Sequence, residues 1–99
     1  MTDYPGGLIQ VILPSTLLAG EKTVAAAGSP EALAGSTAVV SGVVVQAKPA
    51  NAGNVLIGNS TSQKILLTAG ESVPLSIDNL SKVYVDVTVN GEGVNYVGG

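Results

Sequence analysis

The chain has 99 residues, enough for one small domain, and carries four Lys against seven Asp and Glu, which gives a net charge of −3. It has no His, Cys, Arg, Trp or Phe, which excludes disulfides, thiolate chemistry and the usual catalytic base. Four Lys without Arg form no basic cluster of the kind that contacts phosphates, so we expect no nucleic-acid partner.

Only 11% of the residues are charged, less than half of the usual fraction of about 25% for soluble domains. A membrane protein, a disordered polar chain and a protein covered by other protein are the three explanations. No apolar run approaches the roughly 20 residues of a membrane-spanning helix, and β-branched residues are too abundant for a disordered chain. We therefore expect protein partners on much of the surface, and no membrane partner.

The segment 1–20 differs in pattern from the rest of the chain, because Pro5 and Pro14 bound a nearly unbroken apolar run. The apolar side chains of this run are Leu8, Ile9, Val11, Ile12 and Leu13. It lacks the basic flank of a signal peptide, so we interpret it as mature protein. The run is either the first strand of the domain's own sheet or an arm that docks on another subunit. We predict the arm, resting on a sister copy or on the shell beneath, followed by a domain over residues 21–99.

From Gly20 onward, turn residues recur about every eight to twelve residues, a spacing typical of sandwiches and barrels. Strands are expected over Lys22–Ala27, Thr37–Lys48, Asn54–Gly58, Lys64–Thr68, Ser72–Asp78, Lys82–Val89 and Val94–Val97. Ser29-Pro30-Glu31 has the sequence of a short helix's first turn. Parallel strands need long crossovers that do not fit here. The sequence thus predicts an all-β fold: an antiparallel β-sandwich, jelly-roll-like or Ig-like, of about eight strands with an N-terminal arm.

The strand at Lys82–Val89 has the plainest pattern, because every odd position is valine and every even one is polar or amphipathic. Residues that alternate in this way share one face, and we expect that face to be buried. Its members are Val83, Val85, Val87 and Val89, and Val73, Leu75 and Ile77 are expected in the same core. Asn90-Gly91-Glu92-Gly93 then predicts a hairpin into Val94–Val97.

Two other strands carry special positions. Thr37–Lys48 places Val39, Val43 and Val45 on one face and Val40 and Val44 on the other, so both faces need cover. Gly42 within it predicts a bulge or a close approach of backbone. In Ser72–Asp78, Pro74 cannot donate to a ladder and predicts an edge strand.

The sequence indicates no catalytic residue, no cofactor and no metal. The acidic residues Glu71, Asp78, Asp86 and Glu92 fall where a turn or an outer strand face would expose them. Zinc ligands are missing, and no loop gathers the acids that calcium requires. The sequons at Asn59 and Asn79 are interpreted as turn sequences. We expect a protein that is not an enzyme.

Five segments occur in an order that resembles a known family. They are Val43–Pro49, Gly53–Asn59, Leu67–Val73, Ile77–Val85 and Val89–Tyr96. Residues 22–97 resemble the small β-sandwich proteins encoded among the virion structural genes of tailed bacteriophages, which often have aromatics where this chain has Val55 and Ile57. The resemblance implies no catalytic residue. It implies a structural role in decorating a capsid or in a neck, tail or fibre.

The function that the sequence predicts is a capsid decoration protein on the outer shell of a phage. Its expected partners are the major capsid protein or other virion proteins and further copies of itself, with a trimer favoured, and its expected location is the virion, assembled in the host cytoplasm. A tail, neck or fibre component is the alternative. A carbohydrate-binding or ligand-binding β-module is a third reading, weakened because sugar sites favour aromatic platforms.

Overall fold

The computed structural model describes residues 16–99. The expected arm residues Leu8, Ile9, Val11, Ile12 and Leu13 lie outside the described residues. The strands are β1 (Leu18–Thr23), β2 (Glu31–Ala32), β3 (Val43–Ala47), β4 (Val55–Gly58), β5 (Gln63–Leu67), β6 (Ser72–Leu75), β7 (Tyr84–Val87) and β8 (Gly93–Gly98). A 3₁₀ turn, η1 (Leu80–Lys82), precedes β7. β1 begins within the segment 1–20, so Leu18 to Gly20 belong to the sandwich.

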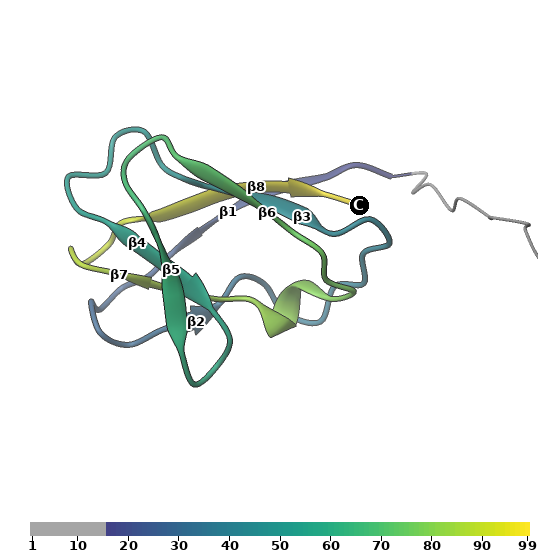
Figure 1. Cartoon of the computed structure of the whole chain (residues 1–99), viewed down its shortest axis with the longest axis horizontal. Helices are drawn as coiled ribbons and strands as arrows, with labels where there is room; N and C mark the ends of the chain where they lie inside the picture. Colours follow the sequence, from purple (N-terminus) through teal and green to yellow (C-terminus); the bar gives the residue numbers. More distant parts are fainter. Residues whose placement is uncertain (1–15) are drawn as a thin grey trace, which may run out of the picture.

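The strands form two antiparallel sheets of four that pack face to face (Figure 1). We call them by their strand orders: the β8 sheet, β1-β8-β3-β6, and the β7 sheet, β2-β7-β4-β5. Each of the first four strands pairs with the strand that has the same position counted back from the C-terminal end: β1 with β8, β2 with β7, β3 with β6 and β4 with β5. These pairs alternate between the two sheets. The arrangement is that of an eight-stranded jelly roll rather than an Ig-like sandwich.

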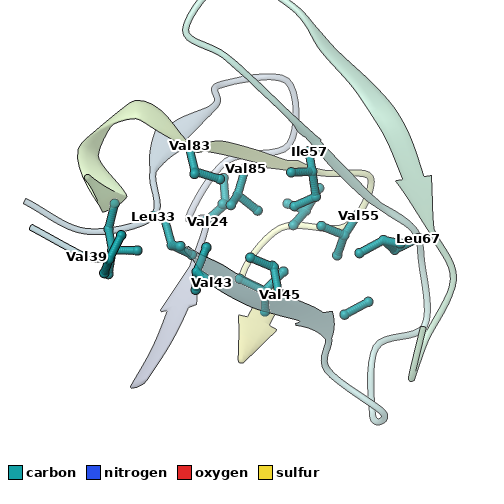
Figure 2. Packing of buried hydrophobic residues seen from close by; sticks show 14 residues of the cluster. Val24, Leu33, Val39, Val43, Val45, Val55, Ile57, Leu67, Val83 and Val85 are labelled. Carbon is teal, nitrogen blue, oxygen red and sulfur yellow. The ribbon is translucent and has the colours of Figure 1, made fainter. Parts of the chain in front are cut away.

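The core lies between the two sheets, and its buried residues within 16–99 are all aliphatic, with the half-buried Tyr96 packed against them. Val43 and Val45 point from β3 toward Ile57 and Val85 of the opposite sheet (Figure 2). Along β3, the inward residues Val43, Val45 and Ala47 are buried, whereas Val44 between them is exposed. The period-two alternation of the sequence is therefore the alternation between core and surface.

The prediction for Lys82–Val89 is confirmed for three of its valines and wrong for the fourth. Val83, Val85 and Val87 are buried, but Val89 is 41% exposed. The ladder between β7 and β4 is incomplete beyond Val87: the Thr88 N–H donates to the Asn54 carbonyl oxygen at 3.1 Å, but the Asn54 N–H donates to the Thr88 Oγ1 at 2.8 Å instead of a backbone oxygen. The chain then leaves the sheet. The expected companions Val73, Leu75 and Ile77 are half-buried and pack against this core.

The hairpin expected around Asn90-Gly91 is wrong. β7 and β8 belong to different sheets, and β8 lies between β1 and β3. The turn is held against the end of β1 instead: the Gly91 N–H donates to the Val24 carbonyl oxygen, and the Val24 N–H donates to the Glu92 carbonyl oxygen. The turn sequence therefore marks a crossing between layers.

Two other elements differ from expectation. Ser29-Pro30-Glu31 forms no helix, because Glu31 and Ala32 pair with β7. The first strand is Leu18–Thr23 rather than Lys22–Ala27, since the Ala27 and Gly28 N–H groups donate to the side chains of Asn90 and Asp86. Both of these bonds pull the chain out of the sheet and toward the β7 side.

Gly42 sits at a close approach of backbone, as predicted. Its φ is +90°, a region that favours glycine, and a Cβ atom there would clash with the carbonyl oxygen of Leu75. This contact brings the start of β3 against the end of β6. Pro74 lies in β6, which is an edge strand of the β8 sheet, as the sequence predicts.

Candidate interaction surface

An apolar row crosses the whole outer face of the β8 sheet. In the strand register, Ala19 of β1 lies opposite Val97 of β8, Val97 opposite Val44 of β3, and Val44 opposite Pro74 of β6. All four residues are exposed. Residues directly opposite each other share a face of the sheet, so these side chains form one continuous line across four strands.

The row continues into an open hollow at the end of the sheet where β1 begins and β8 ends. This hollow has a volume of about 310 Å³, and Leu17, Val44, Val97 and Pro74 line it together with backbone of Gly42 and Gly99. Leu17 is 75% exposed, and the nearby Val40 is 57% exposed. We call Leu17, Ala19, Val40, Val44, Pro74 and Val97 the apolar patch. Exposed apolar surface that gathers in this way usually marks an interface.

The next row along the same face is polar. It consists of Glu21, Asn95, Gln46 and Ser72, in the same order of strands. The Lys48 Nζ lies 2.7 Å from Glu21 Oε1. The negative charge of Glu21, on the edge strand β1, is therefore paired with a lysine that lies nearer the centre of the sheet. The apolar patch therefore has a sharp polar border on one side.

The four edge strands differ in how open they are to another strand. β6 contains Pro74, β2 has only two residues, and β5 contains Lys64 and pairs with β4 through a register shift at Ile57/Gly58 of β4. Short edges, prolines, lysines and bulges are the usual ways to prevent strand addition. β1 has six residues in unbroken register with β8, and none of them is proline. No strand within residues 16–99 covers its outer edge.

The acidic residues singled out from the sequence do not come together. Glu92 accepts hydrogen bonds from the N–H groups of Ala52 and Gly53 at 2.6 and 2.9 Å. Asp86 accepts from the Gly28 N–H at 2.8 Å. Glu71 accepts from the Thr68 N–H at 2.7 Å, and Asp78 lies 2.8 Å from the Lys82 Nζ. Each carboxylate is therefore part of a separate turn or ion pair.

Neighbouring groups lower the pKa of four exposed carboxyls. A hydrogen bond and the charge of Lys48 lower the pKa of Glu21, and those of Lys82 lower the pKa of Asp78. The pKa of Glu31 falls because of hydrogen bonds from Lys22 and from the Ala25 N–H. Hydrogen bonds from Thr68 lower the pKa of Glu71. These shifts favour the ionised form and make none of the four a proton donor near neutral pH.

The two sequon asparagines organise turns. Asn59 Oδ1 accepts from the N–H groups of Thr61 and Ser62, and Asn79 Oδ1 accepts from those of Thr37 and Ser81. Asn79 thus caps η1 and ties it to the segment before β3. Both side chains have the roles that turn sequences predict.

Within residues 16–99 no group of three or more acidic side chains could hold a metal ion, and no buried polar side-chain atom lacks a partner. In the same part of the chain no helix is long and apolar enough to cross a membrane. A second hollow of about 240 Å³ lies at the opening between the two sheets, lined by Ile57, Ile65, Leu75 and Ile77. Its lining also includes Lys82, whose Nζ is paired with Asp78, and it contains no acid.

Sequence reasoning found part of the apolar patch. The alternation in the expected strand Thr37–Lys48 marked Val40 and Val44 as apolar residues on the second face, and both are exposed in the structure, although Val40 lies before β3. It missed Leu17, and it missed Ala19, Val97 and Pro74 as members of the row. These become neighbours of Val44 only through pairings between distant strands, and no local signal reports such pairings.

Comparison of the chain with family models, with curated proteins and with solved structures finds no match.

Proposed function

We propose that this protein is a virion structural protein of a tailed bacteriophage, and specifically a capsid decoration protein that binds the outer shell as a homo-oligomer. The observation that carries the proposal is the apolar row Ala19–Val97–Val44–Pro74 on an otherwise open sheet face. Covering a sheet face of this kind with other protein lowers the free energy by roughly 25 cal/mol per Å² of apolar surface removed from water.

The occupant of the apolar patch in this proposal is the shell protein. Apolar contact with a polar border suits protein better than an anionic or sugar ligand, because the patch carries no cation and no aromatic platform among its six residues. The low charge of the chain, 11% of residues, supports a surface that is largely covered in use.

The resemblance of residues 22–97 to small phage β-sandwich proteins supports the same role. The jelly roll is used in viral capsid proteins and also in lectins, so the fold is compatible with the proposal without deciding it. The scattered acids and their turn contacts support a role without catalysis. Each of them already has a structural partner.

Quantitative mass spectrometry of purified virions from the encoding phage tests this function. A decoration protein is expected at hundreds of copies per particle, whereas a handful of copies would replace the proposal with a tail or neck role. Absence from the particles would refute a virion role altogether. A matched pair of variants links the result to the surface: Val44→Lys is expected to abolish incorporation, and Gln46→Lys, on the polar row of the same strand and face, to preserve it.

A further inference from the structure

The turn between β7 and β8 contains Asn90-Gly91, the one asparagine of the chain that is followed by glycine. Both residues are exposed, and the turn closes with a hydrogen bond from the Glu92 N–H to the Val89 carbonyl oxygen at 3.3 Å. Glycine has no Cβ, so its backbone nitrogen can approach a neighbouring side chain more closely than that of any other residue. The turn therefore places a carboxamide next to an unshielded amide nitrogen, in contact with water.

An asparagine in this setting can lose its side-chain amide without an enzyme. The Gly91 nitrogen attacks Cγ of Asn90, a new C–N bond closes a five-membered succinimide ring, and the bond from Cγ to Nδ2 breaks. Ammonia leaves and takes the Gly91 amide proton with it. Water then opens the ring. Attack of water at Cγ gives aspartate, whereas attack at the backbone carbonyl carbon gives isoaspartate, in which the main chain runs through Cγ.

In the folded protein, hydrogen bonds to the segment after β1 hold both reacting groups. The Gly91 N–H, which must lose its proton, donates to the carbonyl oxygen of the buried Val24 at 2.8 Å. Asn90 Oδ1, on the carbon that is attacked, accepts from the Ala27 N–H at 2.8 Å. Ring closure removes the Gly91 proton and pulls the carboxamide back toward its own main chain. It therefore competes with both hydrogen bonds.

We propose that Asn90 is a site of spontaneous deamidation, and that its rate is set by how often the turn between β7 and β8 separates from Val24 and Ala27. Exposed turns open locally much more often than the core unfolds. The loss of ammonia is not reversed, so the modified form accumulates with the age of the protein. The site is independent of the proposed function, because it depends only on the chemistry and the contacts of one turn.

The two products differ in their effect on the crossing between the sheets. Aspartate keeps a side-chain oxygen for the Ala27 N–H and leaves the main chain unchanged. Isoaspartate adds a carbon atom to the main chain directly before Gly91, which moves the Gly91 N–H away from the Val24 carbonyl oxygen. The neighbouring bond, from the Val24 N–H to the Glu92 carbonyl oxygen, lies at the same turn. Isoaspartate therefore loosens the contact that directs β8 to the side of β1.

Peptide mapping by mass spectrometry tests the site in the unmodified full-length chain. The protein is incubated in mildly alkaline buffer, once folded and once in guanidinium chloride. In the denatured chain Asn90 should react fastest of the six asparagines. In the folded chain its rate should be lower by about tenfold or more, because two hydrogen bonds must open first. Equal rates would overturn the proposal, and so would faster reaction of another asparagine in the denatured chain.

Ala27→Pro tests the bond to Asn90 in the folded protein. Ala27 is exposed and precedes Gly28, whose φ is +87°, in a turn closed by a bond from the Ser29 N–H to the Ala26 carbonyl oxygen. This is the position of a type II turn that favours proline, and proline has no N–H to donate. The rate at Asn90 should rise severalfold in the folded chain and stay the same in guanidinium chloride.

Ala27→Ser is the matched control, because it keeps the N–H group and should leave both rates at Asn90 unchanged. Absence of a rise in Ala27→Pro would overturn the role of the bond from Ala27. The comparison of the folded and denatured unmodified chain needs no variant, so a folding defect in Ala27→Pro would not shelter the proposal.

Amide hydrogen exchange tests the effect of isoaspartate. Aged protein is separated by chromatography into its aspartate and isoaspartate forms, and Asn90→Asp supplies the aspartate form directly. In the isoaspartate form the amides of Val24 and Gly91 should exchange about tenfold faster or more, since each loses its partner. Asn90→Asp should keep the unmodified rates, and the core amide of Val45 should not change in either form. Unchanged protection of Val24 in the isoaspartate form would overturn the loosening of the crossing.

Discussion

Val44 of β3 lies directly opposite Val97 of β8, and each side chain is 46% exposed on the outer face of the β8 sheet. The next residue along β3, Val45, is fully buried on the other face. One strand therefore serves both the core and the candidate interface, and substitutions at adjacent positions should separate stability from binding.

Replacing Val44 by Thr should leave the free energy of unfolding within about 0.5 kcal/mol of the unmodified protein, since the site is exposed and Thr is a good strand residue. Val45→Ala should lower it by about 2 kcal/mol, because buried methyl groups are lost. Urea unfolding measures both. Equal effects at the two positions would contradict the assignment of the two faces.

Gly42→Ala should destabilise the protein by about 2 kcal/mol or more, because φ is +90° and the new Cβ would clash with Leu75 backbone. Gly70→Ala is the matched control. Its φ is +85°, but nothing lies within 4 Å of the added Cβ, so only the conformational cost of about 1–2 kcal/mol remains. The melting temperature of Gly42→Ala should therefore be lower than that of Gly70→Ala. The reverse order would show that a small shift of the neighbouring backbone relieves the clash at little cost in free energy.

Glu92→Ala should loosen the loop before β4, since the carboxylate holds the N–H groups of Ala52 and Gly53. A loss of about 1 kcal/mol is expected for these partly exposed bonds. Amide hydrogen exchange should accelerate at Ala52 and Gly53 and remain unchanged at Val45 in the core. Uniform acceleration would indicate that Glu92 supports the whole fold instead.

Stability should be constant between about pH 5.5 and 7, since no side chain present has an ordinary pKa there. It should fall under acid. The carboxyls with lowered pKa values are Glu21, Glu31, Glu71 and Asp78. A lowered folded-state pKa gives stability that is present above the unfolded value of about 4 and is lost as the pH falls through the folded value. Chemical denaturation at a series of pH values should show this decline, and a rise toward acid would contradict the pKa directions.

Much of the fold follows from local pattern. Alternation predicted the buried faces of β3 and β7, and Pro74 predicted an edge strand, because both signals act within a single strand. The pairing of strands is decided elsewhere. Asn90-Gly91 marks a turn correctly but does not say whether β8 returns beside β7 or crosses to β1. Hydrogen bonds from the turn to Val24 decide that, and Val24 lies far away in the sequence.

The candidate surface was predictable to the same extent. Val44 could be identified as an apolar residue that faces away from the core, because its neighbours Val43 and Val45 alternate with it. Its partners Val97 and Ala19 could not be identified from the sequence, since their contact with Val44 depends on β8 lying between β1 and β3. A row that spans four strands is a property of the topology.

The pairing of β1 with β8 has a consequence for biosynthesis. Leu18 and Gly98 are partners, so the β8 sheet cannot close until the last strand has been made. Before that point β1 and β3 lack the strand that lies between them, and the inward face of β3 has no completed sheet to hold it. A ribosome-bound chain must therefore keep its aliphatic faces exposed until synthesis of β8 ends. Folding then depends on pairings between distant strands, which places it among the slow all-β domains, on a scale of roughly milliseconds to seconds.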